Sequence, residues 1–129
     1  MTNKKGFTIL EIVIVVIFAS LFFIIFFVQK ANLDAMYRDE ARKTAINAMY
    51  YALEKDFYPK NGYYPEYISK ENISVIDPNL WTDPSGYQLG EPESSYSYQP
   101  ANCSQGQCQE FILKANLEKE DSYIKTSQN

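Results

Sequence analysis

The sequence predicts an α+β protein in which a long N-terminal helix, membrane-spanning in its first half, carries a small antiparallel β-sheet on its second half. Three observations predict it: an apolar run of membrane length near the N-terminus, a helical pattern free of glycine and proline up to Tyr58, and alternating strand patterns near the C-terminus. The 129 residues leave room for one small domain beside the membrane helix.

The apolar run occupies residues 7–28. Between Ile12 and Val28 it has no glycine, proline or charge, and Ser20 is its only polar residue. About 20 apolar residues cross a ~30 Å hydrocarbon core, and a helix satisfies its own backbone in lipid. Lys4 and Lys5 precede the run, whereas the residues after it are mixed in sign. The positive-inside rule therefore predicts a cytoplasmic N-terminus, with everything after the run outside.

One carboxylate, Glu11, interrupts the apolar start of this helix. An acidic residue deep in a bilayer costs roughly 2.5–3.5 kcal/mol on insertion scales, and less near the interface. At about 6 Å along the helix from Phe7, Glu11 is either a tolerated interfacial carboxylate or a functional group.

The stretch Lys4–Glu11 reads KKGFTILE and leads directly into the apolar run. It resembles the type III signal of type IV pilins and type II secretion pseudopilins. The resemblance implies that a prepilin peptidase removes residues 1–6 by cutting between Gly6 and Phe7, and methylates the new N-terminal Phe7. It also implies a homopolymer in which Glu11 pairs with the N-terminal amine of a neighbouring subunit. An inner-membrane assembly platform and a cytoplasmic assembly ATPase would be further partners.

The chemistry of such a pair follows from the cost of charge in lipid. A lone ammonium and a lone carboxylate are each expensive there. Within one subunit they lie four residues apart and partly satisfy each other; in a helical bundle Glu11 can take the amine of the next subunit. Removing one partner of a buried ion pair costs about 3–5 kcal/mol, so the pair would fix the axial register between subunits.

Residues 29–58 continue the helix with an amphipathic pattern, and Pro59 is expected to end it. The predicted buried stripe consists of Ile46, Met49, Leu53 and Phe57. Small residues that allow close approach accompany it: Ala41, Ala45, Ala48 and Ala52. The charged residues expected mostly off the stripe are Asp39, Arg42, Lys43, Glu54 and Lys55.

Residues 59–94 are predicted to form a long connection because glycine and proline recur along it. Two of its segments resemble pilin or pseudopilin elements: Asn61–Pro65 (NGYYP) and Asp83–Gly86 (DPSG). Some major pseudopilins bind calcium in nearby loops, and the oxygens available here belong to Asp83, Glu91 and Glu93. Their spacing matches no calcium loop, so turn formation and a solvated acidic surface are the expected roles. Glycosylation-type triplets start at Asn72 and Asn102.

Residues 95–129 are predicted to form the antiparallel sheet. The segment Phe111–Glu118 alternates apolar and polar residues, and residues 121–129 are expected to be a surface tail. Cys103 and Cys108 both lie outside the membrane in the predicted topology, so we expect them to form one disulfide that closes a hairpin. A metal site would need more cysteine or histidine than the chain has.

Composition excludes most other classes. The chain has no histidine, no recognisable activated nucleophile and no evident catalytic carboxylate pair, so we expect no enzyme and no cofactor. A net charge of −4 argues against strong nucleic-acid binding. We predict a filament subunit for adhesion, twitching motility, DNA uptake or secretion, first in the inner membrane and then extracellular. The alternative is a signal-anchored binding or adhesin domain that never polymerises.

Overall fold

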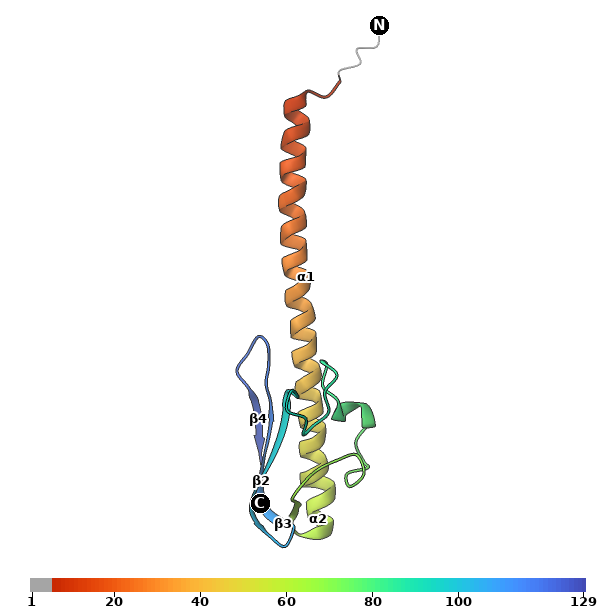
Figure 1. The fold of residues 1–129 in the computed structure, drawn as a ribbon, viewed down its shortest axis with the longest axis vertical. Helices are drawn as coiled ribbons and strands as arrows, with labels where there is room; N and C mark the ends of the chain where they lie inside the picture. Colours follow the sequence, from red (N-terminus) through yellow and green to blue (C-terminus); the bar gives the residue numbers. More distant parts are fainter. Residues whose placement is uncertain (1–5) are drawn as a thin grey trace. The chain divides into compact units, whose positions relative to one another are not determined.

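The structure is a computed structural model that describes residues 6–129, in two units that divide at Asp34 and Ala35. Lys4, Lys5 and all of the predicted leader except Gly6 lie outside the described residues. Helix α1, Ile9–Tyr51, contributes to both units (Figure 1).

In the first unit, α1 carries the predicted apolar run. Its large apolar side chains between Ile12 and Val28 are 45 to 69% exposed, so nothing within the unit covers them. Within the described residues, the helical stretch from Ile9 is the one segment long and apolar enough to cross a membrane. The polar Ser20 does not disturb the helix, because its hydroxyl donates to the carbonyl of Ile17 at 2.8 Å. The chain is thus compatible with a single-pass membrane anchor.

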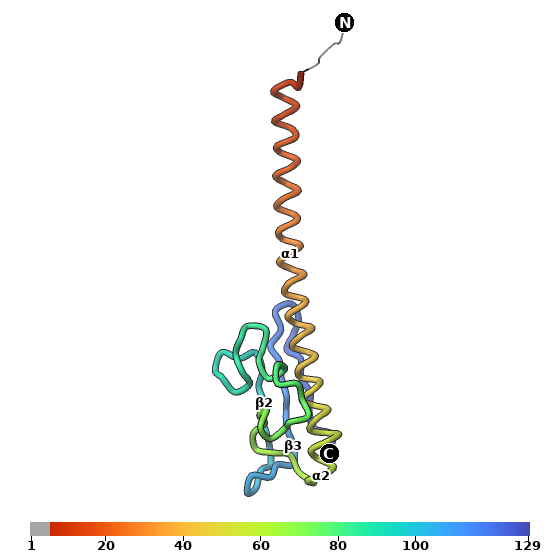
Figure 2. The backbone as a smooth tube through the Cα atoms, turned by 90° about the vertical axis from the view of Figure 1, so that its right-hand side faces the viewer, coloured from red at the N-terminus to blue at the C-terminus, as the bar shows by residue number. Residues whose placement is uncertain are grey.

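The second unit contains an antiparallel sheet of four strands: β1 (Tyr64–Pro65), β2 (Tyr96–Ser104), β3 (Gln107–Ala115) and β4 (Tyr123–Thr126). Strand β3 is central and pairs with β2 along its whole length. Its other edge pairs with β1 at the beginning and with β4 at the end. The strands run alongside the C-terminal half of α1 (Figure 2). The predicted α+β architecture is therefore confirmed.

The core lies between the sheet and this half of α1. Ile46, Met49 and Leu53 are fully buried, as the periodicity predicts, and Phe57 packs against them half-buried. From the sheet, Phe111 and Leu113 alternate inward along β3 and close the core.

Pro59 does not end the helix, contrary to the prediction. After α1 the backbone continues as a π-helical segment, η1 (Ala52–Phe57), and then as α2 (Tyr58–Asn61). Pro59 is tolerated because it stands in the first turn of α2, where its missing N–H is not needed. Termination falls instead on Gly62, which adopts φ of 77° and donates its N–H to the carbonyl of Tyr58.

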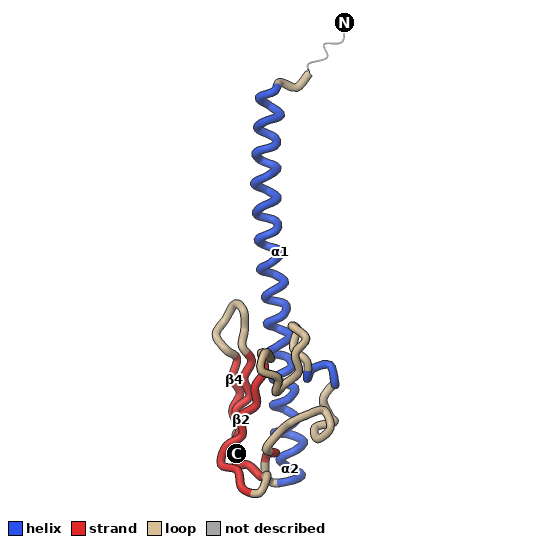
Figure 3. The backbone as a smooth tube through the Cα atoms, viewed as in Figure 1, coloured by secondary structure: helices blue, strands red, loops and turns tan. Residues whose placement is uncertain are grey.

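The long connection and the tail also differ from the prediction. The connection contains β1, which pairs with β3, and a short 3₁₀ helix, η2 (Pro78–Trp81), between its loops (Figure 3). The predicted surface tail includes β4, which pairs with β3 through backbone hydrogen bonds. Both strands have four residues or fewer, too short to show an alternating pattern.

Candidate functional site

The start of α1 is closed by a reciprocal pair of side chains, Thr8 and Glu11. The N–H and the hydroxyl of Thr8 donate to Oε2 of Glu11 at 2.8 and 3.0 Å. The N–H of Glu11 reaches Oγ1 of Thr8 at 3.3 Å. This is a capping box, in which an N-terminal threonine and a glutamate three residues on satisfy each other's backbone donors. The spacing Thr-x-x-Glu in the sequence was sufficient to predict it, although we predicted only the function of Glu11.

The peptide bond between Gly6 and Phe7 lies just before this cap. Both residues precede α1, adopt neither helix nor strand, and are exposed. A methyl group added at Gly6 would meet nothing within 4 Å. A protease could therefore draw this backbone into an extended conformation without unwinding α1.

In the second unit, a partly buried cluster of charged residues connects α1 to the residues that follow β3. We call Arg38, Asp39, Arg42 and Glu118 the charged cluster. Asp39 and Arg42 are 2 and 3% exposed and lie 2.8 Å apart. Glu118 follows β3 and accepts hydrogen bonds from both arginines at 2.5 to 2.8 Å. The prediction that Asp39 and Arg42 would lie off the buried face is wrong.

Hydrogen bonds keep the carboxylates of the cluster ionised. Burial alone would raise the pKa of Asp39. Hydrogen bonds from the backbone N–H groups of Glu118 and Lys119, together with Arg42, have the larger opposite effect. The pKa of Asp39 is therefore lowered. The hydrogen bonds from Arg38 and then Arg42 lower the pKa of Glu118 to about 2. The cluster therefore stays fully charged at neutral pH.

The predicted turn Asp83–Gly86 packs against the same cluster. Asp83, 4% exposed, accepts the N–H groups of Ser85 and Tyr87 at 2.9 and 3.0 Å. It also accepts the N–H and hydroxyl of Ser95 at 2.8 and 2.7 Å, and Arg42 donates to the Ser95 hydroxyl. Asp83 thus organises its loop as predicted for a turn residue, but it is buried rather than solvated.

The other calcium candidates make local contacts. Glu91 accepts the N–H of Gln88 at 2.7 Å, and Glu93 is exposed. Among residues 6–129 no group of three or more His, Cys, Asp or Glu side chains is arranged to hold a metal ion.

A second buried carboxylate, Glu54, lies in η1 and was also predicted off the buried face. It accepts the hydroxyl of Tyr64 at 2.9 Å and the N–H of Gln128 at 3.0 Å. Burial, reinforced by the adjacent Glu54, raises the pKa of Tyr64 to about 12, so the phenol remains a donor. Glu54 thereby ties the helix to β1 and to the residues after β4.

The predicted disulfide between Cys103 and Cys108 is present. It joins facing residues of β2 and β3 at the turn end of their hairpin, beside the pairing of Tyr64 with Cys108. Of the glycosylation-type triplets, Asn72 uses its amide for hydrogen bonds to Ser69 and Tyr67. Asn102 is exposed, with φ of 54°.

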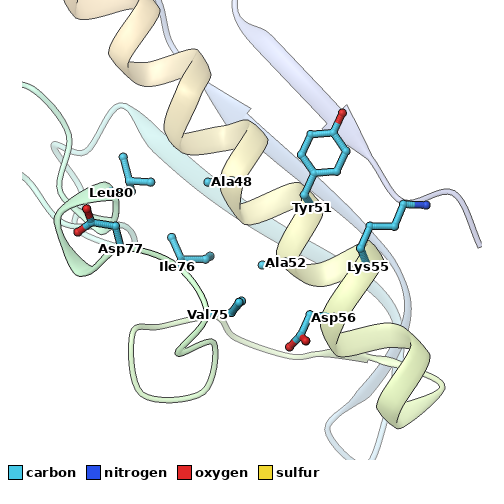
Figure 4. Close-up of a pocket in the computed structure, with 9 residues that line it drawn as sticks. All are labelled: Ala48, Tyr51, Ala52, Lys55, Asp56, Val75, Ile76, Asp77 and Leu80. Atoms are coloured by element: carbon cyan, nitrogen blue, oxygen red, sulfur yellow. The ribbon is translucent and has the colours of Figure 1, made fainter.

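Two adjoining hollows lie on one side of the helix formed by α1 and η1. The connection around η2 forms their other wall. One, of about 350 Å³, contains Ala48 and Tyr51 on the helix and Val75 and Ile76 across from them (Figure 4). The other, of about 320 Å³, has Tyr37, Ala41 and Thr44 along the helix. Leu80 belongs to both. We call the two together the helix groove.

No protein-family model matches this chain, and no curated protein or solved structure matches it either. A functional assignment therefore depends on the resemblance of residues 4–28 to a pilin signal and on the geometry around Glu11.

Proposed function

We propose that this chain is the precursor of a pilin-like or pseudopilin-like subunit, processed at Gly6–Phe7 and assembled helix to helix into a filament. One observation carries the proposal. A carboxylate, Glu11, lies in the first turn of an apolar helix that nothing in its own unit covers, directly after an exposed peptide bond. Hydrolysis of that bond leaves a carboxylate on Gly6 and an ammonium on Phe7. A sulfonium methyl donor from the cell then transfers one methyl group to the amine of Phe7, which loses one proton in exchange.

Glu11 has two roles that can be separated by experiment: it caps its own helix and it pairs with a neighbouring subunit. In the uncleaved chain the carboxylate is satisfied by Thr8 of its own helix, which suits a monomer in the membrane. In the filament it pairs with the amine of a neighbouring copy, since an ammonium without a counter-charge is unstable in an apolar bundle. A local cap requires a hydrogen-bond acceptor at this position, whereas subunit pairing requires a negative charge.

Substitution of Glu11 by glutamine separates the capping role from the pairing role. Glutamine also serves in a capping box but carries no charge. We expect Glu11→Gln and Glu11→Ala both to reduce filament yield at least tenfold in cells that express the full chain with its peptidase and assembly machinery. Asp34→Ala, at an exposed carboxylate of the same helix, is the control and should assemble normally. Filaments from Glu11→Gln at the parental yield would contradict the pairing.

Processing gives a second readout of the same proposal. The measured mass of the filament protein should equal that of a chain that begins at Phe7 and carries one extra methyl group. Full-length chain in assembled material would contradict the cleavage. The alternative, an anchored domain that does not polymerise, predicts neither filaments nor any effect of Glu11.

A further inference from the structure

We infer that Asn102 is the acceptor of an N-linked glycan, which is transferred to its side-chain amide from a lipid-linked oligosaccharide. The triplet Asn102–Ser104 (NCS) meets the sequence requirement, since the residue between asparagine and serine is not proline. The chain has a second such triplet at Asn72, and the structure distinguishes the two. The inference rests on the predicted membrane orientation, in which the second unit is outside, and goes beyond the filament function.

The side chain of Asn72 is already used to hold the connection together. Its Oδ1 accepts the N–H of Ser69 at 2.7 Å, and its Nδ2 donates to the carbonyl of Tyr67 at 2.7 Å. Ile73, the next residue of that triplet, is 4% exposed and belongs to the core. A transferase would have to break both hydrogen bonds and disturb the core before it could reach this amide. We therefore expect no glycan at Asn72.

The side chains of Asn102 and Ser104 are both available. Both residues are exposed, and neither side chain has a hydrogen-bond partner within residues 6–129. The asparagine amide receives the sugar, and the hydroxyl two residues later is the other group that defines the triplet. No side-chain contact has to be broken before a transferase binds these two groups in the folded chain.

The backbone at Asn102 leaves the regular pairing of the hairpin. Its φ of 54° lies in the left-handed region, which asparagine adopts more readily than most residues. Strands β2 and β3 pair just before it, at Ala101 with Glu110, and just after it, at the two cysteines, but not at Asn102 itself. The acceptor residue is therefore not fixed by a paired neighbour on β3.

The space around the acceptor is sufficient for a bulky sugar. Residues 102–107 are all exposed and form the turn end of the β2–β3 hairpin, at the lower end of the second unit in Figure 2. A methyl group added at Gly106 in this turn would meet nothing within 4 Å. Strand β2 is also an edge of the sheet, because β3 is its one partner among the described strands. A glycan at Asn102 would therefore extend into solvent without displacing another side chain.

The transfer needs one co-reactant, an oligosaccharide joined through pyrophosphate to a membrane lipid. The bond between C1 of its first sugar and a phosphate oxygen breaks, and the oxygen keeps the electron pair. A bond forms between this carbon and Nδ2 of Asn102, which loses one proton to a base of the transferase. Because the donor is a lipid, a chain with a membrane anchor meets it in the same bilayer.

Mass spectrometry of the full chain, purified from the cells that naturally produce it, tests the acceptor. We expect the peptide that contains Asn102 to carry at least one sugar and the peptide that contains Asn72 to carry none. Asn102→Gln should abolish the added mass, whereas Asn72→Gln, the same change at the other triplet, should leave it unchanged.

Substitutions at Ser104 test whether the whole triplet is recognised. Ser104→Ala removes the hydroxyl and should abolish the glycan, whereas Ser104→Thr keeps a hydroxyl and should retain the glycan within twofold of the parental occupancy. All variants should form the disulfide between Cys103 and Cys108, which shows that the hairpin has folded. An unmodified Asn102 in the parent, or a modification that survives Ser104→Ala, would overturn the inference.

These outcomes are distinct from those that test the filament. Parental filaments in which Asn102 is unmodified would overturn the glycan and leave the proposed function standing. A chain that carries the glycan but forms no filament when its machinery is present would overturn the proposed function and leave the acceptor site standing.

Discussion

At the scale of single residues, the interior of the second unit depends on charges that balance one another. Asp39 has the N–H groups of Glu118 and Lys119 and the guanidinium of Arg42 around it. Its partners after β3 are 79 and 80 residues away along the chain. An apolar periodicity gives no sign of such partners, so the sequence predicted the stripe at Ile46 and Met49 correctly and misplaced Asp39, Arg42 and Glu54.

Removal of the Asp39 carboxylate leaves Arg42 buried with less counter-charge. We expect Asp39→Ala to destabilise the fold by about 3–5 kcal/mol, measured by urea unfolding of the full chain in detergent with tyrosine fluorescence. The control Asp121→Ala removes an exposed carboxylate and should change stability by less than about 0.5 kcal/mol. Equal effects of the two substitutions would contradict the role of the charged cluster.

The free energy of unfolding should also depend on pH because of Glu118. Its pKa is about 2 in the fold and about 4.3 in an unfolded chain. A carboxyl with a lowered folded pKa contributes stability above the unfolded value and loses it as pH falls through the folded value. We expect the urea midpoint to fall between about pH 4.3 and pH 2. Glu118→Gln should flatten part of this slope, and an unchanged slope would contradict the prediction.

At the scale of elements, the strands and the helix stripe followed from local pattern, whereas the helix end did not. Proline normally disfavours helix in the residue before it. Here η1 changes the helical hydrogen bonding just before Tyr58, and Pro59 falls in a new first turn. The short strands β1 and β4 form because β3 offers them an open edge, which is a tertiary cause.

The disulfide should stabilise the β2–β3 hairpin. Its short closed loop gives about 2 kcal/mol on the chain-entropy model. We expect the double substitution Cys103→Ser and Cys108→Ser to lower the free energy of unfolding by about that amount while the sheet remains, as followed by circular dichroism. Ser94→Ala and Ser104→Ala together provide a control that leaves the crosslink intact. A loss below about 0.5 kcal/mol would mean that β1 and β2 already hold the hairpin closed.

At the scale of the whole molecule, the sequence predicted an α+β chain with one membrane-length helix, and the structure has both. The apolar run could be predicted from composition alone, because no contact within its own unit is needed to define it: its large apolar side chains are exposed there.

The predicted membrane orientation can be tested through charge. Lys4→Glu with Lys5→Glu removes the positive residues before the apolar run, so fewer chains should insert with the second unit outside. Protease added to intact spheroplasts should degrade the second unit of the parent and protect a larger fraction in the variant. Lys114→Glu with Lys119→Glu, far along the chain, is the control and should match the parent. Equal digestion of all three would contradict the orientation.

The π-helical segment near the end of the long helix has a consequence for how such a chain can vary in length. A π turn holds one more residue than an α turn. A homologue shorter by a single position in Ala52–Phe57 would run as an unbroken α-helix, and Tyr58 and the residues after it would keep about the same faces, because the narrower turn compensates for the missing residue. The same deletion within Ile9–Tyr51 would rotate everything after it by about 100°. Single-residue gaps among natural variants should therefore fall in Ala52–Phe57 rather than in the α-helical part of the chain.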